Sequence, residues 1–170
     1  MQPDAGLVSA KGSSLAMTKK KVLILCTGNS ARSQMAEGLM RHEAGDRFEV
    51  ASTGTHPTHL RQEAVAVMSE LGIDISNHRS KPVDEFAAWD FDYIITVCDH
   101  ARDTCPVFPG HGERLHWPIE DPASATGSEE QRRAAFRKAR DDIRARILRW
   151  VTGDAIFQGH QHPLRFGEER

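Results

Sequence analysis

Apolar runs mark the strands in the middle of the chain. Residues 22–25 (Val-Leu-Ile-Leu) form a continuous apolar run that ends at Cys26, and residues 93–97 form a similar run that ends at Cys98. A run without polar alternation is typical of a strand buried on both faces, as in a parallel sheet. Both cysteines therefore stand at predicted strand ends, which is where function gathers in open parallel sheets.

Shorter strands and helical patterns complete the predicted fold. Two more strands are expected at residues 48–51 and 115–119. Apolar residues recur at helical spacing over residues 31–44, 64–71 and 129–151. Strands that alternate with helices indicate the α/β class, with right-handed crossovers. We expect three layers, in which helices flank a central parallel sheet of four strands. No internal repeat divides the pattern, so it predicts one domain over residues 20–152.

The two ends of the chain lack this pattern. Residues 1–19 contain no basic segment followed by a continuous apolar core, so a signal peptide is not expected there. We interpret residues 1–19 as a disordered extension. Residues 153–170 are rich in Gly, His and Gln and are interpreted as a C-terminal tail.

Composition excludes several classes of protein. The chain has 170 residues and a net charge of -2, so it is not a globally basic nucleic-acid binder. It has no apolar stretch of the roughly 18 residues that a membrane helix needs. We expect a cytoplasmic monomer without nucleic-acid or membrane partners. A framework of structural disulfides would leave one of the three cysteines unpaired, so the thiols need another explanation.

The segment between the first strand and the first helix carries the main chemical signal. Backbone N–H groups converge in such a turn, and the start of the helix adds positive potential, so together they can cradle a tetrahedral oxyanion. Arg32 can bind two oxygens of the anion at once. The same field predicts a thiol of lowered pKa at Cys26, with a hydrogen bond from Ser33 to the sulfur. The residues expected to bind the oxyanion are Thr27, Gly28, Asn29, Ser30, Ala31, Arg32 and Ser33.

Cys98 and Cys105 admit more than one interpretation. His100 and His111 lie nearby, but no Cys-x2-Cys pair is present, and a metal site is not expected. The two thiols could be structural. They could also form a redox pair. A helical segment between them would hold them about 10 Å apart. Since a disulfide needs Cα atoms roughly 4.4–6.8 Å apart, that segment would have to unwind, and thiol exchange would change the conformation.

The string CTGNSARSQMAEG, which begins at Cys26, resembles the active-site loop of the low-molecular-weight tyrosine phosphatase superfamily. The resemblance is closest to the thioredoxin-coupled arsenate reductases. It covers roughly residues 20–150 and implies a phosphatase-like fold. It also implies a relay in which Cys26 attacks arsenate, a Cys26–Cys98 disulfide forms, and a Cys98–Cys105 disulfide follows. Thioredoxin would re-reduce the protein without a bound cofactor, and phosphate or sulfate would compete as oxyanions.

Asp121 and Pro122 match the Asp-Pro loop of this family. Proline holds the preceding residue in an extended backbone, so Asp121 could act as a general acid, although Asp-Pro also occurs in ordinary turns. The phosphatase branch commonly places tyrosines after this loop. Here Ala123, Ser124 and Ala125 follow, and the one tyrosine of the chain is Tyr93, which favours a small inorganic substrate.

Two alternatives to arsenate reduction stay open. One is a low-molecular-weight protein tyrosine phosphatase that hydrolyses phosphate monoesters through a Cys26 phosphoenzyme. The other is an anion or redox sensor without turnover.

The resemblance also bears on a cation site. Some arsenate reductases bind potassium beside the loop through Asn, Glu, Ser and Asp. Asn29, Glu37 and Ser52 match three of these positions, and Lys81 stands at the fourth. We hypothesise that the Lys81 ammonium replaces the potassium ion, so no metal is expected. The alternative for Glu37 and Ser52 is ordinary polarity at the surface of a helix and at a strand end.

Overall fold

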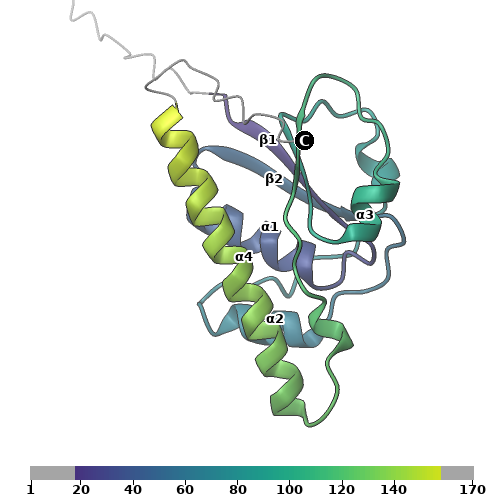
Figure 1. Cartoon of the computed structure of the whole chain (residues 1–170), viewed down its shortest axis with the longest axis vertical. Helices are drawn as coiled ribbons and strands as arrows, with labels where there is room; N and C mark the ends of the chain where they lie inside the picture. The colour runs from purple at the N-terminus through teal and green to yellow at the C-terminus, as the bar shows by residue number, and fades with distance from the viewer. Residues whose placement is uncertain (1–17, 158–170) are drawn as a thin grey trace, which may run out of the picture.

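A parallel sheet of four strands forms the centre of the molecule (Figure 1). The computed structural model describes residues 18–157. The strands stand in the order β2-β1-β3-β4, and every neighbouring pair is parallel. They are β1 (Lys20–Cys26), β2 (Phe48–Gly54), β3 (Tyr93–Thr96) and β4 (Glu113–His116). The predicted four-stranded parallel sheet is confirmed.

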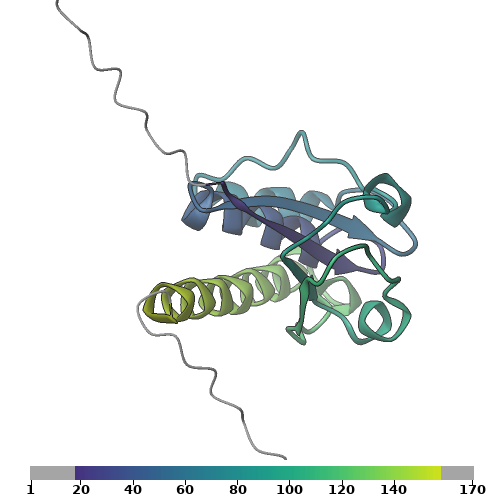
Figure 2. The same cartoon turned by 90° about the horizontal axis from the view of Figure 1, so that it is seen from above.

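Helices connect the strands and cover the sheet. The long α4 lies on one side of the strands in Figure 2, where it packs against α1 and α2. Two short 3-10 helices lie in the connections. The helical elements are α1 (Arg32–Ala44), α2 (Gln62–Ser69), η1 (Val83–Phe86), α3 (Asp99–Thr104), η2 (Pro122–Ser124) and α4 (Glu129–Phe157).

The central strand β1 is buried on both faces. Val22 and Ile24 belong to a large core shared with α1, α2 and α4, whereas Leu23 points into a smaller cluster on the other face. That cluster is built around Phe91 and Phe108. Side chains alternate between the two faces of a strand, so a fully apolar run is what this position requires.

Two boundaries differ from the predictions. β4 covers Glu113–His116 rather than 115–119. The chain after β4 still runs beside β3, because the N–H groups of Trp117 and Ile119 donate to the backbone carbonyls of Thr96 and Val97. Pro118 has no N–H to extend the ladder. The last helix continues to Phe157, beyond its predicted end at residue 151, because a single glycine inside a helix costs only about 1 kcal/mol.

Parts of the predicted domain division fall outside the described residues. These are residues 1–17 of the proposed extension and residues 158–170 of the proposed tail. Within residues 18–157, no helix combines the length and the apolar character that crossing a bilayer demands.

Candidate active site

The loop between β1 and α1 closes around the sulfur of Cys26. Asn29 has a positive φ of 47°, a left-handed conformation that asparagine tolerates better than most residues. In this conformation its backbone N–H donates to Cys26 Sγ at 3.2 Å. Ser33 Oγ lies 2.8 Å from the same sulfur. The predicted loop from strand end to helix start is therefore present, with the thiol at its base.

The predicted lowering of the Cys26 pKa is wrong. Burial raises the pKa of this thiol, because only 3% of the residue is exposed and a thiolate there loses its hydration. The hydrogen bonds involving Ser33, the N–H of Asn29 and the charge of Arg32 oppose this effect without cancelling it. The neutral thiol is thus favoured in the structure.

A buried hydrogen-bond network holds the loop in shape. The Asn29 side-chain amide donates to Ser33 Oγ at 2.8 Å and to Ser52 Oγ at 3.0 Å. Its carbonyl oxygen accepts from the backbone N–H of Lys81 at 2.9 Å. Gln34, which the sequence predictions missed, donates to the Asn29 backbone carbonyl at 3.0 Å. Because these groups are buried, each lost bond would be costly, and the loop has little freedom to relax.

Glu37 is the buried charge behind this network. Its carboxylate accepts from Ser52 Oγ at 3.1 Å and pairs with Arg41 at 3.0 Å. The Lys81 ammonium lies 3.8 Å away, and His78 Nδ1 lies 3.3 Å away. Burial lowers the pKa of Lys81, and Glu37 opposes that shift in part. The structure thus brings together Glu37, Ser52 and Lys81, as predicted. Arg41 and His78 were missed, although Arg41 follows Glu37 at the i,i+4 spacing of helical ion pairs.

The potassium ion that the resemblance implies beside the loop does not fit the side chains around Glu37, because one of them is the Lys81 ammonium. Lys81 already presents a positive charge to Glu37 at the position where the family pattern has a carboxylate. Among residues 18–157, no group of three or more His, Cys, Asp or Glu side chains is arranged to hold a metal ion.

Arg32 is aimed by two groups from the loop before η2. Its guanidinium donates to the Ile119 carbonyl at 3.0 Å and lies 3.8 Å from Asp121 Oδ2. The other carboxylate oxygen, Asp121 Oδ1, accepts from the N–H of Ala123 at 3.0 Å. Asp121 has an extended backbone before Pro122, as predicted. The structure therefore places this half-exposed carboxyl group beside the arginine of the loop.

Cys98 lies beside the loop because β3 is the neighbour of β1 in the sheet. Its sulfur stands 3.4 Å from the hydroxyl oxygen of Thr27, the residue that follows Cys26. Cys98 also caps the start of α3, where its sulfur accepts a hydrogen bond from the N–H of Ala101 at 3.4 Å. The Thr27 contact had no signal in the sequence, since it depends on the order of strands.

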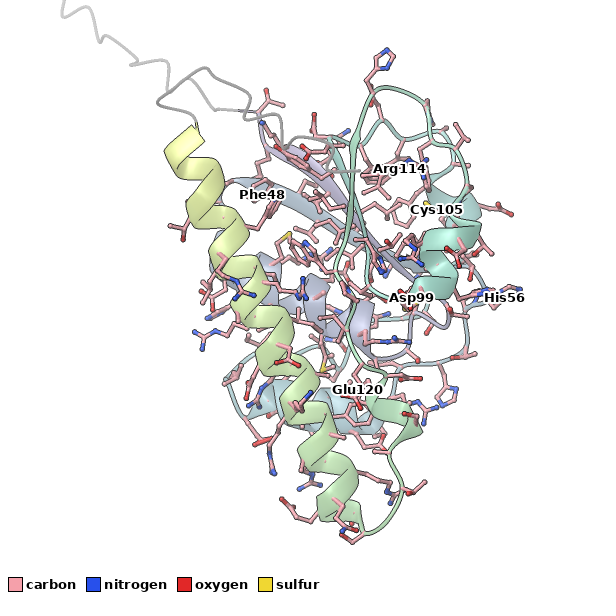
Figure 3. All side chains as sticks on the ribbon, in the orientation of Figure 1. Phe48, His56, Asp99, Cys105, Arg114 and Glu120 are labelled. Carbon is pink, nitrogen blue, oxygen red and sulfur yellow. The ribbon has the colours of Figure 1, made fainter. Side chains whose placement is uncertain are left out.

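Cys105 lies at the opposite end of α3, as Figure 3 shows by the positions of Cys105 and Asp99. Burial raises the pKa of its thiol, and Arg114 opposes that shift in part. All three cysteines are free thiols. The segment between Cys98 and Cys105 is helical, so it holds them about 10 Å apart along its axis. A direct disulfide between them therefore requires α3 to unwind.

Tyr93 does not contribute to the site. It lies on β3 in the core and packs edge-on against Trp150, with ring centroids 4.8 Å apart. The residues after Asp121 form the short η2 and carry no aromatic ring. The site therefore combines a buried thiol, an arginine, a carboxyl group and two further thiols, without an aromatic crevice beside the Asp-Pro loop.

Comparisons with known proteins identify the family and several relatives of this chain. The family model for low molecular weight phosphotyrosine protein phosphatase matches residues 21–158. An arsenate reductase of Halalkalibacterium halodurans is 45% identical over 131 residues, which are 77% of this chain and 94% of that protein.

Two solved structures are also similar. An arsenate reductase in an oxidized state has a TM-score of 0.67 at 31% identity, and the match covers 79% of this chain and 98% of that one. A thioredoxin-dependent arsenate reductase of Corynebacterium glutamicum has a TM-score of 0.62 at 28% identity, and the match covers 84% of this chain and 65% of that one. This chain belongs to the low molecular weight phosphotyrosine protein phosphatase family, and its curated relatives at 45% identity are named arsenate reductases.

Proposed function

We propose that this protein reduces arsenate to arsenite through three thiols, Cys26, Cys98 and Cys105. The observation that carries the proposal is the position of the second thiol. The sulfur of Cys98 lies 3.4 Å from Thr27, which adjoins the nucleophile, and Cys105 stands at the other end of the same short helix. A phosphatase needs only the first thiol.

In the first step, arsenate binds the loop N–H groups and Arg32. The Cys26 thiolate attacks arsenic, an As–S bond forms, and one oxygen leaves as water after protonation. We assign the supply of that proton to Asp121, whose carboxyl group lies 3.8 Å from the guanidinium that binds the anion. Because burial raises the pKa of the Cys26 thiol, the attacking thiolate forms by loss of its proton to the bound anion or to the solvent.

In the second step, the thiolate of Cys98 attacks Cys26 Sγ. The electron pair of the As–S bond stays on arsenic, which becomes arsenite, and a Cys26–Cys98 disulfide forms. Two electrons have then passed from the protein to the substrate.

In the third step, Cys105 attacks Cys98 and releases the Cys26 thiolate. The new Cys98–Cys105 disulfide forms only as α3 unwinds, which exposes it to a reductant. Thioredoxin is the proposed reductant and NADPH the final electron source through thioredoxin reductase. The thioredoxin-dependent relative supports this choice of partner. No bound cofactor is required by these steps.

Lys81 has a supporting role in the proposal. Its ammonium offsets the buried charge of Glu37, which holds Ser52 and through it the Asn29 side chain. The cluster keeps the loop in its anion-binding form without a potassium ion.

The phosphatase alternative uses Cys26, Arg32 and Asp121 alone. The family model supports the shared fold and loop. The absence of aromatic residues in η2 favours a small oxyanion over an aryl phosphate.

A coupled assay tests the proposal. Arsenate should drive NADPH consumption only when thioredoxin and its reductase are both present, and phosphate or sulfate should inhibit it. Replacing thioredoxin with glutaredoxin and glutathione should give little turnover. Rapid hydrolysis of p-nitrophenyl phosphate together with inert arsenate would establish the phosphatase instead. Oxyanion binding without either turnover would establish a sensor.

A further inference from the structure

Two side chains of β4 reach the two ends of α3. Arg114 and His116 are separated by one residue, so they project from the same face of the strand. Neither residue has a role in the steps above. Figure 3 shows Arg114 toward the end of α3 that carries Cys105, while Asp99 marks the other end.

His116 anchors the end that carries Cys98. Its Nε2 atom lies 2.9 Å from Asp99 Oδ1, and its Nδ1 atom lies 2.7 Å from Thr96 Oγ1. The first residue of α3 is thereby tied to the sheet next to Cys98. This end is also held by the Thr27 contact, so it has few ways to move when the helix opens.

Arg114 contacts the end that carries Cys105. Its guanidinium donates to the Pro106 carbonyl at 2.9 Å, and the Cys105 thiol points at the same oxygen at 3.6 Å. The sulfur and the guanidinium therefore converge on one carbonyl. Arg114 is also the charged side chain that opposes the effect of burial on the Cys105 pKa. Its long, exposed side chain can follow the sulfur as the turn moves.

We propose that Arg114 is a positioning residue for the last thiol exchange, which holds the Cys105–Pro106 turn on β4 and stabilises the Cys105 thiolate that attacks Cys98. The inference rests on the proposed relay. The exchange is balanced: the Cys105–Cys98 bond forms, the Cys26–Cys98 bond breaks, and the electron pair leaves on Cys26. The proton of Cys105 passes to solvent. Arg114 takes part in none of these bonds and acts through the charge and place of the attacking sulfur.

Rapid quenching separates this exchange from the earlier steps. Reduced protein is mixed with arsenate, without thioredoxin, and stopped with an alkylating agent. Peptide mass spectrometry then follows the Cys26–Cys98 and Cys98–Cys105 disulfides in time. The variant is Arg114→Gln, the conservative variant is Arg114→Lys, and the control is Arg149→Gln, which removes the same charge from the exposed surface of α4.

The expected result is a selective delay. Arg114→Gln should release arsenite at the wild-type rate but convert the first disulfide into the second about 3- to 10-fold more slowly at neutral pH, since about one pKa unit corresponds to a tenfold change in thiolate. The delay should shrink at alkaline pH. Arg114→Lys should recover part of the rate, and Arg149→Gln should match wild type.

Two outcomes overturn the inference in different ways. If Arg114→Gln converts the disulfides at the wild-type rate at every pH, Arg114 has no such role and the relay stands. If wild type never forms the Cys26–Cys98 disulfide, the relay itself fails, and the inference fails with it.

Discussion

At the residue scale, the protonation of Cys26 controls the first step. The sequence suggested a low pKa from the loop, the helix start and Arg32. That expectation counted the groups that stabilise a thiolate and omitted the cost of burial, which no local sequence pattern shows. In the folded protein, burial raises the pKa of Cys26. The thiolate fraction, and with it the rate of attack, should therefore increase as the pH rises toward that pKa.

Ser33→Ala should sharpen this dependence. In the wild type, the Ser33 hydroxyl lies 2.8 Å from the sulfur and lowers the pKa of Cys26. The variant removes this hydroxyl, so the pKa of Cys26 should rise further. Arsenite formation should fall about tenfold at neutral pH, where one pKa unit changes the thiolate fraction tenfold, and should approach the wild-type rate at high pH. The measurement is a pH profile of single-turnover arsenite release, with the exposed Ser69→Ala as control. An unshifted profile would show that Ser33 does not act on the thiol.

Lys81 gives a second test at this scale. Because its ammonium already faces Glu37, wild-type protein should melt at the same temperature in potassium and sodium chloride at equal ionic strength. Lys81→Asp should be destabilised by about 3–5 kcal/mol, since a buried carboxylate loses one of its partners and gains a like charge. Potassium should then restore more stability than sodium. A clear preference of the wild type for potassium would contradict the role given to Lys81.

At the scale of elements, the sequence predicted the four strands and the helices with an apolar periodicity, and it missed α3 and the two 3-10 helices. The continuous apolar run of β1 predicted this strand because the strand is buried on both faces, and the recurrence of apolar residues at helical spacing predicted α1. The six-residue α3 was not predicted, since it is too short for apolar periodicity and only Ala101 within it is buried. The contact between Cys98 and Thr27 was equally out of reach, because it depends on which strands are neighbours.

Oxidation should open α3 and leave the other helices intact. A Cys98–Cys105 disulfide cannot span about 10 Å of helix, so the amides of residues 101–105 should lose protection when it forms. Hydrogen exchange of the reduced and oxidised protein measures this, with α1 as the internal control. Full protection of α3 in the oxidised protein would exclude the 98–105 pairing.

At the scale of the whole molecule, the sheet order brings the chemistry together. β1 and β3 are neighbours and parallel, so both present their carboxyl ends, with Cys26 and the residues leading to Cys98, at one edge. α3 then spans the distance between Cys98 and Cys105. In the proposed relay, the disulfide is transferred along this path from Cys26–Cys98 to Cys98–Cys105. Each thiol acts in its own step, so replacing one cysteine should block one step.

The Cys98→Ser variant tests this central claim most directly. The relay predicts that Cys98→Ser abolishes arsenate-dependent NADPH consumption with thioredoxin and its reductase, because Cys26 then has no partner thiol. Any hydrolysis of p-nitrophenyl phosphate should persist, since Cys26, Arg32 and Asp121 are unchanged, and this activity also shows that the variant is folded. Sustained arsenate reduction by Cys98→Ser would contradict the relay.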